Sequence, residues 1–573
     1  MKTNSIIKFI AGIFILILIN ILLSNNHTKW DLTKEKRHSI SEESIDILKN
    51  IDDKIYITIY LDGSLPSQFE KLKKSTEHIL HTFKSYSNKN IEFEFVNPLE
   101  SEDKEKRDVM RKNLAENNIY PIWVKSKNKN ITTTQITFPA ANIHYNNKSM
   151  SVNLFYENYF YNNSEQDPYT IEQYDIQQSI NKLEYNFIKS IHKICENNQK
   201  HIAFLSGNGE LDSTNTFDIR NTLSEFYSVE YFDISMYEMD SVSGNLKIQE
   251  QLDRINKFDV AIISKPTEKF QNLDKFLIDQ YIMNGGKVLC LLDGTDASMN
   301  NFTNGEISFP INKNNLNLDD LFENYGFKIN NNLIQDLEST KIPITMGTGE
   351  IKYFDWAYNP KITPKSDHII STSIDSILTD FSSNIEIINS EINSSVLLTS
   401  SKKSRLIYSG GEVSLDILSN PPQKNNFNKG EQIISVLLEG RFASQYKNTT
   451  ISNTINFVSE NNDGKMIVVS DGDIIGNKVN PPNFYFPLGF YKYNNSVFKG
   501  NKDFVLNSVQ YLCDDKDLIK IRNKKKEKLR LLDSEKTDNN HSFIKLKNII
   551  IPQIILLLIF FSFHYYRKIK YGK

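Results

Sequence analysis

The sequence predicts an α/β protein in which two folded domains lie between two apolar ends. Three observations predict this class. Strand patterns alternate with helical patterns through residues 201–292, each end of the chain carries a long apolar run, and the composition between the ends is polar enough to fold in water. Alternating strands and helices favour parallel pairing with right-handed crossovers. The 573 residues suffice for about three or four domains.

The first apolar run covers residues 6–23 and predicts a membrane-spanning helix. About 18 residues rise about 27 Å in a helix, close to the roughly 30 Å thickness of the hydrocarbon core. A secretory signal peptide is the alternative, but Ile21-Leu22-Leu23-Ser24-Asn25-Asn26 offers no small-x-small cleavage site. An uncleaved anchor is therefore the favoured interpretation.

The second apolar run covers residues 549–566 and predicts another transmembrane helix. Pro552 lies inside it, and Tyr565 and Tyr566 precede the basic residues Arg567 and Lys568. Aromatic and then basic residues are typical of the cytoplasmic border of a span. Lys2 and Lys8 lie at the start of the first run. We therefore expect both termini in the cytoplasm, the region between the spans in the periplasm, and an inner-membrane location in contact with lipid.

The first folded domain is predicted over residues 31–160. Residues 54–61 alternate apolar and polar side chains as a strand does, residues 69–83 place apolar side chains on one helical face, and residues 91–96 form a second strand. Later strands are expected near residues 135–155. This order resembles a thioredoxin-like domain. No cysteine occurs between residues 31 and 150, so we expect a scaffold or binding surface without redox chemistry.

The second domain is predicted in two parts, residues 172–300 and residues 301–515. The first part begins with an amphipathic helix over residues 176–194 and continues with strands at 201–206, 229–234, 258–264 and 287–292 with helices between them. The second part is less regular and rich in Asn and Ser, although residues 465–470 again form a buried strand. Residues 516–545 are expected to be a charged, helical connector.

The candidate binding residues follow strands of this domain. Asp293, Asp471 and Asp473 come just after strands with a glycine beside them, and Gly207, Asn208, Gly209 and Glu210 follow the strand at residues 201–206. Loops at the carboxyl ends of parallel strands form the usual binding crevice, where carboxylates bind a cation or a sugar hydroxyl. The alternative is that these Asp-Gly pairs and the Gly-x-Gly segment are tight turns.

Several classes of function are disfavoured by the sequence. The chain carries 67 Lys+Arg against 70 Asp+Glu, so the basic face of a nucleic-acid binder is not expected. No P-loop, zinc-protease motif or nucleophile elbow is present, so we expect no catalytic residues, no cofactor and no metal. Cys195, Cys290 and Cys513 lack disulfide or zinc spacing. Cys290 falls inside a predicted strand, which favours a buried thiol.

A resemblance to a known family rests on several strings distributed over nearly the whole chain. They are SGNGE at Ser206–Glu210, DQYIMNGGKVLCLLD at Asp279–Asp293, NNLIQDL at Asn331–Leu337, VVSDGDIIGN at Val468–Asn477 and LRLLDSEKT at Leu529–Thr537. Together with the apolar ends, these strings resemble the GldG family, the gliding-motility-associated auxiliary subunits of bacteroidete ABC transporters. The resemblance implies a non-enzymatic subunit that acts with a separate permease and a separate cytoplasmic ATPase.

Two alternatives stay open. One is an envelope protein that binds a carbohydrate or another ligand through the candidate residues and is not tied to motility. The other is a degenerate hydrolase, because the second domain, expected to be Rossmann-like or flavodoxin-like, also resembles glutamine-amidotransferase-like folds. Those folds expose a cysteine on a strand-to-helix elbow, and this chain has none at that position.

Overall fold

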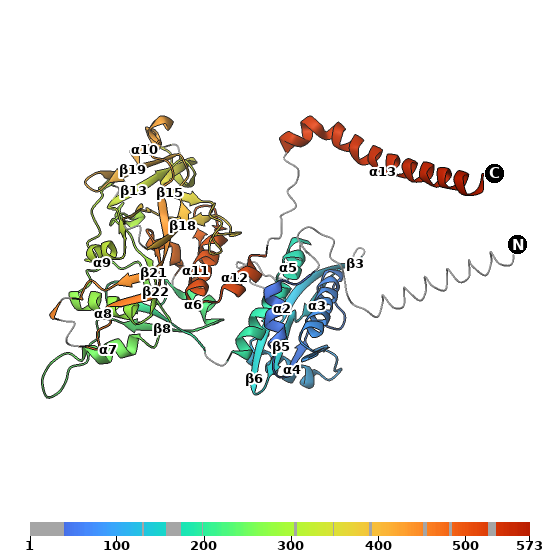
Figure 1. Ribbon diagram of the computed structural model, residues 1–573, viewed down its shortest axis with the longest axis horizontal. Coiled ribbons are helices and arrows are strands. Elements are labelled where there is room, and N and C mark those ends of the chain that lie inside the picture. Colours follow the sequence, from blue (N-terminus) through green and yellow to red (C-terminus); the bar gives the residue numbers. More distant parts are fainter. Residues whose placement is uncertain are drawn as a thin grey trace. The chain divides into compact units, whose positions relative to one another are not determined.

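Figure 1 shows the computed structural model, which describes residues 39–128, 131–155, 173–196, 199–302, 306–347, 349–388, 392–447, 449–450, 455–480, 484–524 and 534–572. Contacts along the backbone divide the chain into two units. The larger unit runs from Ile40 to Lys524, and the other combines Met1–Ser39 with Lys525–Lys573. The predicted connector and second span therefore fall outside the larger unit from residue 525 onward.

The first part of the larger unit is built on a four-stranded sheet in the order β2-β1-β5-β6. β1 pairs with β2 in parallel and with β5 in antiparallel fashion, and β5 pairs with β6 as an antiparallel hairpin. The elements are α2 (Glu42–Lys49), β1 (Ile55–Ile59), α3 (Ser67–Tyr86), β2 (Ile91–Phe95), α4 (Lys104–Glu116), β3 (Ile122–Asn128), β4 (Ile131–Thr137), β5 (Ala140–Tyr145), β6 (Lys148–Asn153) and α5 (Gln173–Cys195).

Apolar periodicity explains why these residues form these elements. β1 buries alternate residues, Ile55, Ile57 and Ile59, as a strand with one face in the core must do. α3 buries Phe69, Leu72, Leu80 and Phe83 at helical spacing against the same core, and α5 adds a second apolar stripe. The sequence did not predict β3, which pairs with β4 in a separate hairpin.

A seven-stranded sheet in the order β18-β21-β22-β10-β9-β7-β8 forms the centre of the second part. β22, β10, β9, β7 and β8 are mutually parallel, whereas β21 and β18 are antiparallel additions at one edge. The strands are β7 (His201–Ser206), β8 (Ser228–Asp233), β9 (Val260–Ser264), β10 (Lys287–Leu291), β18 (Asn393–Thr399), β21 (Ile433–Ala443) and β22 (Glu460–Val469). The order of the parallel strands reverses once, between β7 and β9.

Helices cover both faces of this sheet, so its parallel strands are apolar on both sides. Ile202 and Phe204 of β7 contribute to the core on one face, and Ala203 and Leu205 contribute to the core on the other. The helices are α6 (Phe217–Ser224), α7 (Ile248–Ile255), α8 (Asn272–Met283), α9 (Asp319–Asn324), α11 (Lys499–Leu512) and α12 (Lys516–Arg522). Burial on both faces is characteristic of parallel sheets.

The segment between β10 and β21 is richer in strands than the sequence predicted. Short antiparallel pairs surround a small aromatic core in which Trp356 and Phe381 are buried. Its further elements are η1 (Met299–Asn301), β11 (Ser308–Pro310), β12 (Phe327–Ile329), β13 (Asn332–Asp336), β14 (Ser339–Thr345), β15 (Ile351–Ile362), β16 (Ile377–Leu378), β17 (Ile385–Ile387), β19 (Ser404–Tyr408), β20 (Glu412–Ser414), α10 (Asp416–Ser419) and η2 (Lys424–Asn426).

The region after β22 corrects the expected boundary at residue 515. The elements here are η4 (Gly472–Ile475), β23 (Val479–Asn480), β24 (Phe484–Tyr485), β25 (Phe490–Tyr491) and β26 (Ser496–Val497), and α11 and α12 follow them. The predicted connector begins with α12, which buries Leu518, Ile519 and Ile521 and is therefore part of the folded unit. Most residues of α12 are charged, but its three apolar residues are buried and pack α12 against the folded unit.

The last helix, α13 (Ser534–Tyr571), contains Pro552 and the second predicted span. Its apolar side chains from Ile554 to Phe563 are about half or more exposed. Among the residues that the structure describes, no helix combines the length and the apolarity that a membrane crossing requires. The first predicted span, residues 6–23, lies outside the described residues. Both spans therefore stay predictions.

Candidate functional site

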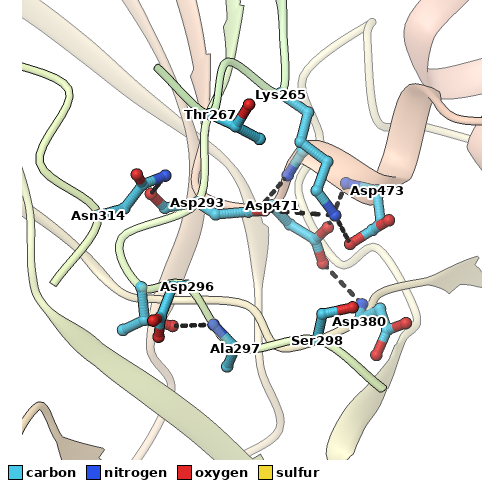
Figure 2. Close-up of polar contacts among 12 residues, drawn as sticks. Lys265, Thr267, Asp293, Asp296, Ala297, Ser298, Asn314, Asp380, Asp471 and Asp473 are labelled. Carbon is cyan, nitrogen blue, oxygen red and sulfur yellow. Dashed lines mark hydrogen bonds and ion pairs between the residues drawn. The ribbon is translucent and has the colours of Figure 1, made fainter. Parts of the chain in front are cut away.

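Three of the predicted site residues converge at the carboxyl edge of the parallel sheet (Figure 2). Asp293 follows β10, and Asp471 and Asp473 follow β22, its parallel neighbour. One oxygen from each of the three carboxylates lies within 4.8 Å of the others. Because parallel strands end at one edge, side chains distant in the sequence meet here.

A lysine that the sequence interpretation missed lies among these carboxylates. Lys265 directly follows β9, and its Nζ lies 2.5 Å from Oδ2 of Asp473 and 3.4 Å from Oδ2 of Asp293. Its backbone adopts a left-handed conformation with φ of 51°, which non-glycine residues adopt rarely. The lysine places a positive charge among the carboxylates, where a bound cation would otherwise be needed.

Asp471 is fully buried, and its hydrogen bonds are all internal. One carboxylate oxygen accepts from the Asp380 backbone N–H and the Ser382 hydroxyl, both at 2.8 Å, and the other accepts from the Asp473 N–H at 2.9 Å. Asp380 and Ser382 belong to the strand-rich segment between β10 and β21. Asp471 therefore ties that segment to the end of β22 and has no oxygen directed to solvent.

The glycines beside the aspartates are required for close approach. A Cβ on Gly472 would lie 2.6 Å from Cβ of Lys265, and a Cβ on Gly294 would lie 2.5 Å from the backbone oxygen of Asn330. The Gly472 N–H also donates to Asp293 at 2.6 Å. These contacts support the interpretation of the Asp-Gly pairs as tight structural turns.

Burial and the charges of neighbouring groups shift the pKa values of the aspartates in this cluster in different directions. Burial raises the pKa of Asp471 well above its usual range, and it raises the pKa of Asp380 to about 7; the charge of Asp473 adds to both shifts. Burial also raises the pKa of Asp293, although Lys265 opposes the shift. For Asp473, burial is outweighed by the attraction of Lys265 and Lys478, which lowers its pKa. Lys265 and Asp473 thus form the charged pair of the cluster.

The Gly207–Glu210 segment forms a separate group at the end of β7. Gly207 and Gly209 have φ of 113° and 71°. The backbone oxygen of Asn208 accepts from the N–H groups of Thr267 and Glu268 at 3.2 and 3.0 Å, and the Thr267 hydroxyl donates to the Gly209 oxygen at 3.0 Å. Hydrogen bonds therefore join the loops after β7 and β9 at the point where the strand order reverses.

Two buried side-chain atoms of this segment keep no hydrogen-bond partner. They are Nδ2 of Asn208, a residue that is 2% exposed, and Oε1 of Glu210. The other oxygen of Glu210 accepts from the Asn208 N–H at 2.7 Å. Burial raises the pKa of Glu210 despite that bond. Both atoms are buried, and the Asn208 side chain opposes the rise in the pKa of Glu210, so a ligand would reach them only if this loop moved.

The predicted buried thiol is confirmed. Cys290 is 1% exposed within β10, and burial raises the pKa of its thiol to about 12. A nucleophilic cysteine needs exposure and a lowered pKa, and Cys290 has neither. The expected elbow position after the strand is held by Asp293 and Gly294 instead.

Lys265, Asp380 and Ser382 are the residues that sequence reasoning missed. Lys265 carried a usable signal, because it is the first residue after a predicted buried strand, as Asp293 and Asp471 are. Asp380 and Ser382 carried none, since they lie in an irregular stretch about 90 residues before their partner Asp471. Only the tertiary structure brings them to the cluster.

Comparisons with known proteins agree with a transport role for this part of the chain. The family described as an "ABC-type uncharacterized transport system" matches residues 199–508, and a domain of unknown function matches residues 34–144. An uncharacterized protein of Borreliella burgdorferi is 23% identical over 572 residues, covering 97% of each chain.

Among solved structures, the "mmIFT52 N-terminal domain" is similar with a TM-score of 0.30 and 12% identity, covering 55% of this chain and 97% of that one. A TM-score of 0.30 does not indicate a shared fold. The match over residues 199–508 spans more than half of the 573 residues and includes the whole aspartate cluster. The chain therefore belongs to the family of auxiliary proteins of ABC-type transport systems.

Proposed function

We propose that this chain is a non-enzymatic, membrane-anchored subunit that faces the periplasm and acts with a separate ABC permease and a separate cytoplasmic ATPase in gliding motility. The family match over residues 199–508 is the observation that carries the transport role. The apolar runs at residues 6–23 and 549–566 support the anchoring, and the resemblance of strings such as SGNGE at Ser206–Glu210 supports the link to motility.

The chemistry of the described residues supports a role without catalysis. The carboxylates at the sheet edge are bonded to Lys265 and to backbone N–H groups, so they are already committed to internal partners. The thiol of Cys290 is buried and holds its proton. Neither group is placed to act as a base or nucleophile on an outside molecule.

Affinity purification from native membranes tests the proposal. The full-length chain would be tagged, cross-linked in intact cells, solubilised in detergent and identified with its partners by mass spectrometry. We expect an ABC permease and an ABC ATPase at near-equal amounts, and loss of both when residues 525–573 are deleted. Recovery of the chain alone from cross-linked membranes would contradict the proposal. Loss of surface spreading in a strain without the chain tests the motility element.

A ligand-binding role is a second candidate, and the unpartnered atoms of Asn208 and Glu210 favour it. Their substitution by alanine should abolish binding of peptidoglycan fragments, measured by calorimetry at a temperature where circular dichroism shows that the variants are still folded. Alanine at Asp293, Asp471 or Asp473 should instead lower stability, because those carboxylates hold the fold together. If N208A and E210A bind the fragments like the natural chain, the second candidate fails.

A further inference from the structure

The start and the end of the unit from Ile40 to Lys524 meet at one carboxylate. Glu184 lies on α5, in the middle of its 23 residues. Its Oε1 accepts from the backbone N–H of Ser41 at 2.6 Å and from the hydroxyl of Ser44 at 2.8 Å. Its Oε2 accepts from Nζ of Lys524 at 2.8 Å. One side chain thus binds both Ser41, which lies 143 positions before Glu184, and Lys524, which lies 340 positions after it.

This contact is sheltered from water, which strengthens it relative to a surface pair. The Glu184 side chain is 13% exposed and that of Lys524 is 22% exposed. Burial opposes the charge of Glu184, but the attraction of Lys524 and the bonds from Ser41 and Ser44 outweigh it and lower its pKa. Removal of Lys524 would leave the carboxylate with neutral donors only.

The helix that leads to Lys524 packs into two domain cores. Leu518 and Ile519 of α12 belong to the core of the seven-stranded sheet, and Ile521 belongs to the core of the first domain. α12 contacts α2 and α5 as well as α11. With seven residues, α12 is far too short to be stable as a helix alone, so its position depends on this packing and on the contact at its end.

We propose that Glu184 is a releasable clamp that joins the segments entering and leaving this unit. A displacement of either segment then moves α12 and, with it, the apolar side chains of α12 that pack in both domain cores. In the closed clamp, Ser41 and Lys524 share the carboxylate. In the open clamp, Lys524 departs while Ser41 and Ser44 stay bound, and the last turn of α12 loosens. The source of the displacement rests on the proposed function, in which the flanking segments contact a transporter that changes shape with ATP.

Hydrogen exchange of the purified full-length chain tests the clamp without any partner. K524M removes the charged donor and keeps the apolar stem, whereas K520M removes the neighbouring lysine, which pairs with Asp517 and Glu43 at the surface and serves as the matched control. We expect exchange of the amides of residues 518–523 to be about tenfold faster in K524M and unchanged in K520M. E184Q should behave as K524M does.

Two results would overturn the clamp. One is unchanged exchange at residues 518–523 in both K524M and E184Q. The other is faster exchange that spreads equally to the strands β7, β9 and β10, because it would show a general loss of stability. If the ABC partners co-purify, ATP should accelerate exchange at these residues in the natural chain and add little in K524M. If no ABC partner co-purifies, the proposed function is contradicted, but the exchange measured on the purified chain alone still tests the clamp.

Discussion

At the scale of single residues, Lys265 decides the character of the candidate site. The three aspartates alone would form a concentrated negative charge, for which the sequence suggested a cation or a sugar. Lys265 places its Nζ close to Asp293 and Asp473, so the chain itself supplies a positive charge to this cluster. The cluster therefore holds the ends of β9, β10 and β22 together, and its residues are best tested by stability measurements.

Replacement of Lys265 should destabilise the fold strongly. K265M removes the positive charge and leaves buried carboxylates facing one another, so we expect a loss of about 3 kcal/mol in the free energy of unfolding, measured in urea. K341M is the matched control, because Lys341 pairs with Asp355 where both side chains are more than half exposed. That control should change the free energy by less than about 0.5 kcal/mol. Equal effects of the two variants would refute the assigned role.

The acidity of Asp380 predicts a pH dependence of stability. Its pKa is raised to about 7 in the folded chain, whereas an exposed Asp titrates near 4. The folded state therefore binds more protons than the unfolded state in this window, so the contribution of Asp380 is present below about pH 4 and is lost as pH rises through about 7.

D380N should remove this part of the slope, measured by urea unfolding between pH 4 and pH 8. The pKa of Asp473 is lowered, so Asp473 changes the free energy of unfolding with pH in the opposite direction. The difference in the free energy of unfolding between the natural chain and D380N therefore isolates the contribution of Asp380. Parallel pH profiles for the two proteins would show that Asp380 titrates normally.

Cys290 should resist thiol reagents in the folded chain. Its thiol is buried and has a pKa raised to about 12, whereas Cys195 is partly exposed with a pKa raised to about 11. Maleimide labelling followed by mass spectrometry should modify Cys195 slowly and leave Cys290 unmodified until denaturant is added. Labelling of Cys290 before Cys195 would reopen the hydrolase alternative.

At the scale of elements, the loops after β7 and β9 act as one structure. Gly209 has φ of 71°, and a Cβ there would overlap the Thr267 hydroxyl oxygen. Gly244 has the same φ of 71° in another loop, with nothing within 4 Å of its Cβ position. Alanine variants at the two positions therefore distinguish the free-energy cost of the left-handed backbone from the cost of the steric overlap.

Alanine at these two positions should give unequal losses. G244A should cost about 1 kcal/mol for the left-handed conformation alone, and G209A should cost about 1–3 kcal/mol more, because the loops must move apart. Thermal unfolding of both variants measures the difference. Equal losses would mean that the loops after β7 and β9 are not held against each other.

At the scale of the whole molecule, the folded cores are contained within one unit. The five apolar clusters use side chains from Ile40 to Ile521 and none of the side chains that are described in α13, residues 552–571. We expect a chain of residues 39–524 to unfold within about 2 °C of the full-length protein, measured by calorimetry with detergent present for both. A much lower midpoint would show that the flanking segments contribute to the fold.

Many strands and helices of both α/β parts could be predicted from the sequence, because apolar side chains recur there at the period of each element; β3 and α7 could not. The sequence located β7, with its bounds, and placed β10 to within one residue, and it identified Cys290 as a buried thiol. Asp293 and Asp471 were recognisable as strand-end residues for the same reason.

The roles of those residues follow from the three-dimensional packing of the chain. Strand order, the approach of Asp380 to Asp471 and the insertion of Lys265 depend on contacts between residues far apart in the chain, and no local pattern encodes them. The same holds for Glu184, which looks like one more polar residue of an amphipathic helix until Ser41 and Lys524 are seen to share it. Periodicity fixes the faces of an element, whereas the partners of a polar side chain follow from the packing of the whole.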